Sequence, residues 1–220
     1  MDSYNKRNFW EAFVIALFIF GVGILLGFLI EANRASRISE DFQLSELSML
    51  DMRAQSDLFD LNNIECGNAL NETISFANRI YDEARQLEKY EGANQIGKEI
   101  IQQHKKYDIL RALLFANTLK IKEKCNSSFY TLLYLYEYQT EDIEKRSRQE
   151  IFSNKLLTLK NEKGEKLLLI PLAGNIESNS IAYIMKVYGI SSLPTILINE
   201  KYKIETIEEL KNISSILAKS

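Results

Sequence analysis

The sequence predicts an α/β protein in three parts: a membrane-spanning helix, a long helical hairpin, and a small domain of alternating strands and helices. Three observations predict it. Residues 9–30 form an apolar run with one charge, residues 38–124 contain few helix breakers, and the remainder alternates short apolar runs with helical segments. The predicted order in that remainder is strand-helix-strand-helix-strand-strand-helix. The expected domains are residues 1–34, 35–126 and 127–220.

Composition excludes several classes of function. The chain has 220 residues and a formal net charge of -3, and it has no basic stripe interleaved with aromatic residues, which argues against a nucleic-acid binder. His104 is the only histidine and has no His or Cys partner at metal-ligand spacing, so we expect a solvated helix residue rather than a metal ligand or a base. No metal and no cofactor are expected.

The apolar run at residues 9–30 is long enough to cross a bilayer, whose hydrocarbon core is about 30 Å thick. A cleaved secretory signal is the alternative, but its apolar core usually spans only about 7 to 15 residues. We therefore expect a single-pass anchor in the cell membrane. Lys6 and Arg7 before the span balance Arg34 and Arg37 after it, and the terminal amine favours an inside N-terminus. The bulk of the chain is then expected to be extracytoplasmic.

Gly23 and Gly27 form a Gly-x-x-x-Gly pair within this run. Small residues at this spacing allow two spanning helices to approach closely, which makes a homo-oligomer possible. Glycine is common in spanning helices in any case, so the pair leaves self-association open.

The middle of the chain has the apolar spacing of amphipathic helices, mostly three or four residues. A break near Gly92 divides the pattern into two arms and predicts two long antiparallel helices. Cys66 lies 26 residues before Gly92, and Cys125 lies 33 residues after it. These similar lengths bring the two cysteines together and predict a disulfide, whereas the alternative is a pair of reduced, buried thiols.

The last part of the chain begins with residues 129–137, which are rich in β-formers and apolar on both faces, as in a central strand. Thr140 is expected to cap the following helix. Four apolar residues are expected on its inward face: Ile143, Ile151, Leu156 and Leu159. The further elements are expected at residues 167–172 (strand), 181–188 (helix), 195–199 and 201–205 (strands), and 207–217 (helix).

The segment Gly-Ile-Ser-Ser-Leu-Pro-Thr-Ile-Leu-Ile-Asn at residues 189–199 places Pro194 between a helix and a buried strand. It resembles the cis-proline loop of the thioredoxin-like fold, and it predicts a cis peptide bond before Pro194. The resemblance covers residues 129–220 and implies a minimal thioredoxin-like domain. The whole chain is similar to membrane-anchored thioredoxin-like proteins that face outside the cytoplasm. The alternative is another small α/β sandwich with a trans proline.

The chain departs from this family where the reactive cysteines would lie. In active members a Cys-x-x-Cys motif follows the first strand at the start of the first helix, where the helix dipole stabilises a thiolate. That position here is occupied by Thr140, Glu141, Asp142 and Ile143. The position therefore has no sulfur nucleophile and carries negative charge, so the resemblance implies a degenerate active site.

The leading hypothesis is therefore a non-catalytic, membrane-tethered thioredoxin-like protein that binds a protein or peptide on the extracytoplasmic side. In the family the cis-proline loop pairs with an extended chain, which implies a binding surface made by Ser191, Ser192, Leu193, Pro194 and Thr195. The hairpin is an alternative binding element. A second hypothesis is a thiol-disulfide oxidoreductase that uses Cys66 and Cys125 as a redox pair.

Overall fold

The computed structural model describes residues 9–30, 66–91, 98–125 and 129–219, together with a few helical residues between 47 and 58. The chain divides into two compact units, Met1–Asp51 and Met52–Ser220. The domain boundaries expected after residues 34 and 126 stay predictions.

The first unit contains an apolar helix, Phe9–Ile30, of 22 residues and mean hydropathy 3.0. At about 1.5 Å per residue it is about 33 Å long, which is long enough to cross a membrane, as expected. Its sidedness stays a prediction. Among the described residues nothing lies within 4 Å of the position that a side chain would take at Gly23 or Gly27, so their role in packing also stays a prediction.

The second unit begins with two helices, α2 (Cys66–Glu91) and α3 (Lys98–Cys125), which are followed by alternating strands and helices. In chain order these are β1 (Tyr130–Tyr136), α4 (Ile143–Lys163), β2 (Leu167–Ala173), α5 (Asn179–Val187), β3 (Thr195–Ile198), β4 (Tyr202–Ile204), α6 (Ile207–Lys211) and α7 (Ile213–Lys219). The mixed α/β class is confirmed. The expected closing helix is divided at Asn212 into α6 and α7.

The four strands form one mixed sheet in the order β2-β1-β3-β4. Strand β1 is parallel to β2, with Leu132 opposite Leu169, and antiparallel to β3, with Leu133 opposite Leu197. Strands β3 and β4 form an antiparallel hairpin. Strand β1 is therefore central and carries no solvent-facing side, which explains why its residues are apolar on both alternating faces.

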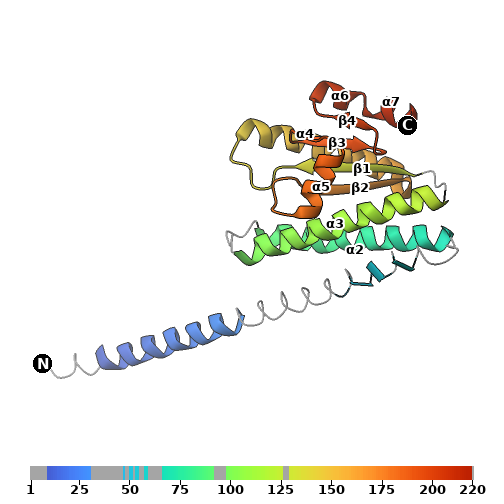
Figure 1. Ribbon diagram of the computed structural model, residues 1–220. Helices are drawn as coiled ribbons and strands as arrows, with labels where there is room; N and C mark the ends of the chain where they lie inside the picture. The colour runs from blue at the N-terminus through green and yellow to red at the C-terminus, as the bar shows by residue number, and fades with distance from the viewer. Residues whose placement is uncertain are drawn as a thin grey trace, which may run out of the picture. The chain divides into compact units, whose positions relative to one another are not determined.

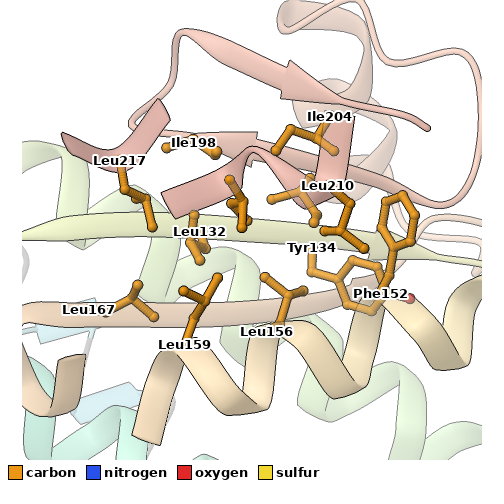
Figure 2. Packing of buried hydrophobic residues seen from close by; sticks show 12 residues of the cluster. Leu132, Tyr134, Phe152, Leu156, Leu159, Leu167, Ile198, Ile204, Leu210 and Leu217 are labelled. Carbon is orange, nitrogen blue, oxygen red and sulfur yellow. The ribbon is translucent and has the colours of Figure 1, made fainter. Parts of the chain in front are cut away.

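Helices α4, α6 and α7 contribute to the core on one face of the sheet. Figure 2 shows Phe152, Leu156 and Leu159 of α4 pointing toward Leu132 and Tyr134 of β1. All five side chains are buried. Ile143 and Ile151 were expected on the same inward face of α4, and this is wrong, because both are exposed.

Helix α3 lies between α2 and the sheet (Figure 1). It contacts β2 and α5 on one side, where the Phe115 ring meets Tyr188, and it contacts α2 on the other. Being covered on two sides, α3 is buried over most of its circumference along residues 106–121. This double coverage explains why charged residues such as Asp108 are buried there with partners.

A polar cluster holds the end of α3 against the start of β1 and the turn between β3 and β4. Lys122 Nζ donates to Thr131 Oγ1 at 2.7 Å and to Asn199 Oδ1 at 3.1 Å, and it pairs with Glu200 at 3.3 Å. Burial lowers the pKa of Lys122, and the nearby Glu200 carboxylate opposes that effect. Residues 199–201 connect β3 to β4, and Lys201 N donates to Ile198 O at 3.0 Å. Asn199 and Glu200, the two central residues of the turn that this bond closes, have φ of 44° and 60°, as tight hairpin turns often require.

The predicted disulfide between Cys66 and Cys125 is present, with 5.6 Å between the two Cα atoms. It joins the first residue of α2 to the last residue of α3, which are 59 residues apart in sequence. The bridge therefore closes the open end of the helical hairpin, beside the polar cluster around Lys122.

We expect Phe152→Ala to lower the free energy of unfolding by about 3–5 kcal/mol, because the truncation leaves a cavity among α4, β1 and α6. Leu157→Ala, on the exposed side of the same helix, is the matched control and should cost less than about 1 kcal/mol. Denaturant titration of the full chain in detergent measures both changes. Equal losses for the two variants would contradict the assigned core.

Candidate functional site at the carboxyl end of β1

The segment after β1 and the start of α4 occupy the position where the sequence predicts a degenerate active site. Thr140 was expected to cap α4, and this is wrong: Asp142 is the cap, and its Oδ1 accepts a hydrogen bond from Lys145 N at 3.0 Å. Thr140 lies two residues too early and is buried. Ile143, the first helical residue, is 77% exposed, and Glu141 is exposed beside it.

The helix start is electrostatically suited to a carboxylate. The backbone N–H of Lys145 donates to Asp142 and lowers the pKa of that carboxyl below its usual value. Lys145 Nζ also pairs with Glu137 and lowers the pKa of the Glu137 carboxyl. The four free N–H groups at the start of a helix favour negative charge, and here this chain's own carboxylate meets that demand.

The predicted loop at residues 191–195 lies between α5 and β3. The Leu193–Pro194 peptide bond is cis, the configuration that the sequence predicts. Ser191 and Ser192 are exposed, Leu193 is partly buried, and Pro194 and Thr195 are buried. Thr195 Oγ1 donates to Ser192 O at 2.6 Å, which closes the loop on itself. Two hydroxyl-bearing residues therefore face solvent while the proline is part of the core.

Arg148 brings this loop against α4. Its Nη2 donates to Leu193 O at 2.9 Å, across 45 residues of sequence, while Arg148 Nε is buried without a hydrogen-bond partner among the described residues. The Leu193 side chain packs over Gly174 at the end of β2: a methyl group added at Gly174 would lie 3.0 Å from both Leu193 δ-carbons. The loop is therefore fixed to α4 by its backbone and to β2 by its side chain.

Two side-chain amides hold the segment that leaves β1. Gln149 Oε1 accepts from Glu137 N at 2.6 Å and Gln149 Nε2 donates to Glu137 O at 3.1 Å. Asn175 does the same for the next residue: Oδ1 accepts from Tyr138 N at 2.8 Å, and Nδ2 donates to Tyr138 O at 2.9 Å. Each amide thus replaces the peptide group of a neighbouring strand, and the chain between β1 and α4 is fixed at two consecutive residues.

His104 lies beneath this segment and is only 12% exposed, so the expectation of a solvated residue is wrong. Its Nδ1 is 3.0 Å from Asp108 Oδ2, its Nε2 is 3.2 Å from Tyr136 Oη, and the Tyr138 ring packs on the imidazole at 3.8 Å between centroids. Asp108 is fully buried and also accepts from Arg111 Nη1 at 3.2 Å. The i, i+4 spacing to Asp108 signals a local pair, but the tyrosines lie more than 30 residues away and give no such signal.

The chemistry open to this site is limited by what its residues supply. The slot of Thr140, Glu141, Asp142 and Ile143 holds no sulfur. Both cysteines are bridged to each other, and Cys125 lies about 30 Å along α3 from His104, at the opposite end of β1. Within the described ranges, no group of three or more His, Cys, Asp or Glu side chains is placed to hold a metal ion. The site offers the exposed apolar side chain of Ile143, the exposed hydroxyls of Ser191 and Ser192, and the fixed backbone of the loop at residues 191–195.

Acid should remove the stabilisation that Asp142 provides. Its lowered pKa means that the folded chain binds this proton more weakly than the unfolded chain, so Asp142 stabilises the fold above about pH 4 and this contribution is lost as the pH falls further. Asp142→Asn keeps an oxygen acceptor for the Lys145 N–H but does not titrate. We expect the variant to lose less stability than the wild type between about pH 6 and about pH 3, measured by denaturant unfolding.

Glu209 also has a lowered pKa, but it titrates in both proteins and cancels in the difference. The pKa of Glu137 is lowered mainly by Lys145 in both proteins, and the Asp142 charge, the last of the causes that act on it, raises that pKa in the wild type alone. Parallel loss of stability in the variant and the wild type would show that Asp142 does not act as a charged cap.

Comparison with known proteins finds no family model that matches this chain, and no curated protein sequence that matches it.

Proposed function

We propose that this chain is a membrane-anchored thioredoxin-like protein that binds an extended segment of a protein or peptide, without thiol chemistry, at the carboxyl end of β1. The binding surface is formed by the start of α4 at Ile143 and by the loop at residues 191–195. The helix Phe9–Ile30 tethers this surface to the membrane, and the disulfide favours the extracytoplasmic side, where such bonds persist.

The sheet supports the thioredoxin-like part of the proposal. A parallel pair, β1 and β2, is extended by the antiparallel hairpin of β3 and β4, in the order β2-β1-β3-β4. Helix α4 packs on one face together with α6 and α7, and α5 contacts α3. The proline loop directly precedes β3, which is the place that the resemblance implies.

The observation that carries the proposal is the hydrogen bond from Arg148 to the Leu193 carbonyl at 2.9 Å. It joins the loop to the second turn of α4, and Arg148 lies about 7.5 Å along the helix from Ile143. Exposed Ile143 and exposed Ser192 therefore flank one strand end. A large apolar side chain that faces solvent beside a fixed backbone edge is suited to bind a chain in extended form.

The hydrogen bond from Arg148 also affects how an extended ligand can bind to the loop. The Leu193 carbonyl, a group that an extended ligand would use for backbone pairing, already accepts from Arg148. An incoming N–H must therefore displace the guanidinium, which weakens binding by the strength of that hydrogen bond.

A second candidate is the oxidoreductase that uses Cys66 and Cys125. The observation that favours it is the partial exposure of both cysteines, which leaves the bridge open to attack by thiols. Cys125 lies about 30 Å along α3 from the end of that helix that contacts the carboxyl end of β1. The cysteine pair is therefore far from the proposed binding surface. If the purified chain accelerates the reduction of insulin by dithiothreitol, which would supply the electrons for each turnover, this candidate would be favoured over the binding function.

Photo-crosslinking tests the proposed surface. A photoreactive phenylalanine at Ile143 or at Ser192, introduced into the full chain in its native membrane, should yield the same discrete crosslinked product. The control position is Leu157, which is exposed on the same helix but lies about 21 Å further along it. A product of equal yield from Leu157, or none from Ile143 and Ser192, would contradict the proposal.

Arg148→Met should raise the yield of that crosslinked product several-fold, because it frees the Leu193 carbonyl while keeping an unbranched side chain. Arg146→Met is the matched control: its guanidinium donates at 2.7 Å to Thr140 O, away from the loop, and its loss should leave the yield unchanged. A fall in yield for Arg148→Met alone would mean that Arg148 contacts the ligand instead of competing with it.

A further inference from the structure

Helix α2 contacts the rest of the second unit mainly through α3. Among its side chains that the structure describes, the buried ones are Ala69, Thr73, Phe76, Ile80 and Ala84. Of these, Phe76 and Ile80 are large and apolar, Leu70 and Ile74 are partly buried beside them, and the Thr73 hydroxyl donates to its own helix at Ala69 O. Along the described residues 66–84, alanine and threonine therefore supply three of the five buried side chains, and these bury little hydrocarbon.

The α3 side of this contact contains a polar group that has no partner. Asn117 is 1% exposed, and neither its Oδ1 nor its Nδ2 forms a hydrogen bond with any described residue. It lies on the stripe of Leu110, Leu114 and Ile121, at spacings of four, three and four residues. His104, Phe115 and Lys122, which contact β1 and Tyr188, lie about a third of a turn around α3 from this stripe. The stripe is thus directed away from those contacts, and we infer that it faces α2, the other helix that packs on α3.

An unpartnered buried amide costs free energy that hydration recovers. Asn117 therefore favours any state in which α2 has left and water reaches this stripe. The apolar contacts of α2 with α3 oppose departure, and so does the Cys66–Cys125 bridge, which joins the first residue of α2 to the last residue of α3. Both cysteines are partly exposed.

We propose that the Cys66–Cys125 disulfide is a redox latch: its reduction lets α2 detach and uncovers the Leu110–Leu114–Asn117–Ile121 stripe of α3. The reductant is an external dithiol, either a small molecule or a protein. Its thiolate attacks Cys125 Sγ, the S–S bond breaks, and Cys66 leaves as a thiolate at the positive end of α2. The second thiol of the reductant then attacks the mixed disulfide, which releases Cys125 as a thiolate and leaves the reductant oxidised by two electrons.

The rest of the unit keeps its structure in the reduced state. Lys122 still binds Thr131 and Asn199 at one end of α3, and His104 still binds Tyr136 at the other. None of these contacts involves α2. Detachment is thus a local opening of one helix, and the surface described at the carboxyl end of β1 does not depend on it.

Hydrogen–deuterium exchange of the full chain in lipid nanodiscs tests the latch, with and without dithiothreitol as the dithiol reductant. On reduction, amides of α2 should exchange about tenfold faster or more, because a cross-link over a loop of this length strongly favours the closed state. Amides of β1 should keep their protection. The Cys66→Ser, Cys125→Ser double variant should exchange like the reduced wild type without reductant.

A further variant, Asn117→Leu, tests the role of the unpartnered amide. It replaces the unpartnered amide by an apolar side chain in the same stripe, so reduction of this variant should leave α2 largely protected. Unchanged α2 exchange in the reduced wild type would overturn the proposal and leave the bridge a static staple. Loss of protection in α2 and β1 together would also overturn it, as would an Asn117→Leu variant that opens as readily as the wild type.

Discussion

The position of α3 along β1 determines most of the architecture of the second unit. Two polar contacts fix it: Lys122 binds Thr131 where β1 begins, and His104 binds Tyr136 where β1 ends. Because both contacts are specific hydrogen bonds in a largely buried setting, a shift of α3 by one turn would leave several polar groups without partners. Helix α3 therefore has one register against β1, and the position of α2 follows from that of α3, on which it packs.

This register of α3 places the disulfide and the slot at residues 140–143 at opposite ends of β1. The disulfide lies at the α3 end near the start of β1, and the slot before α4 lies beyond the end of β1. A thiolate at the slot would benefit from the helix dipole, but Asp142 already occupies that position as the cap. The amides of Gln149 and Asn175 further fix the backbone there. These contacts hold the backbone and the cap of the slot in one arrangement.

The sequence alone was sufficient for features that depend on local pattern or on segment length. The apolar helix, the strand and helix order, and the cysteine bridge between arms of similar length follow from such patterns. Contacts across many residues could not be predicted. The prediction that Ile143 faces inward is wrong because α4 begins at that residue, before the buried stripe of Phe152, Leu156 and Leu159. Likewise, Arg148 meets Leu193 only because the sheet brings the loop to α4.

The cap and the histidine show the same limit in another way. Thr140 and Asp142 are both good capping residues, and the choice between them depends on where the chain leaves β1, which the Gln149 and Asn175 amides decide. A lone histidine among polar residues resembles a surface position, yet Tyr136 and Tyr138 cover it. In both cases the deciding partner lies on another element.

The bridge between Cys66 and Cys125 also determines how tension would pass through the chain. A pull on the segment that joins residue 66 to the apolar helix Phe9–Ile30 crosses the sulfur–sulfur bond directly to residue 125. The 59-residue stretch that contains α2 and α3 is thereby shielded from stretching, and the force arrives near the beginning of β1, whose hydrogen bonds to β2 and β3 are loaded in shear. A chain anchored in one surface and bound to another would, with its bridge intact, resist extension at its helices.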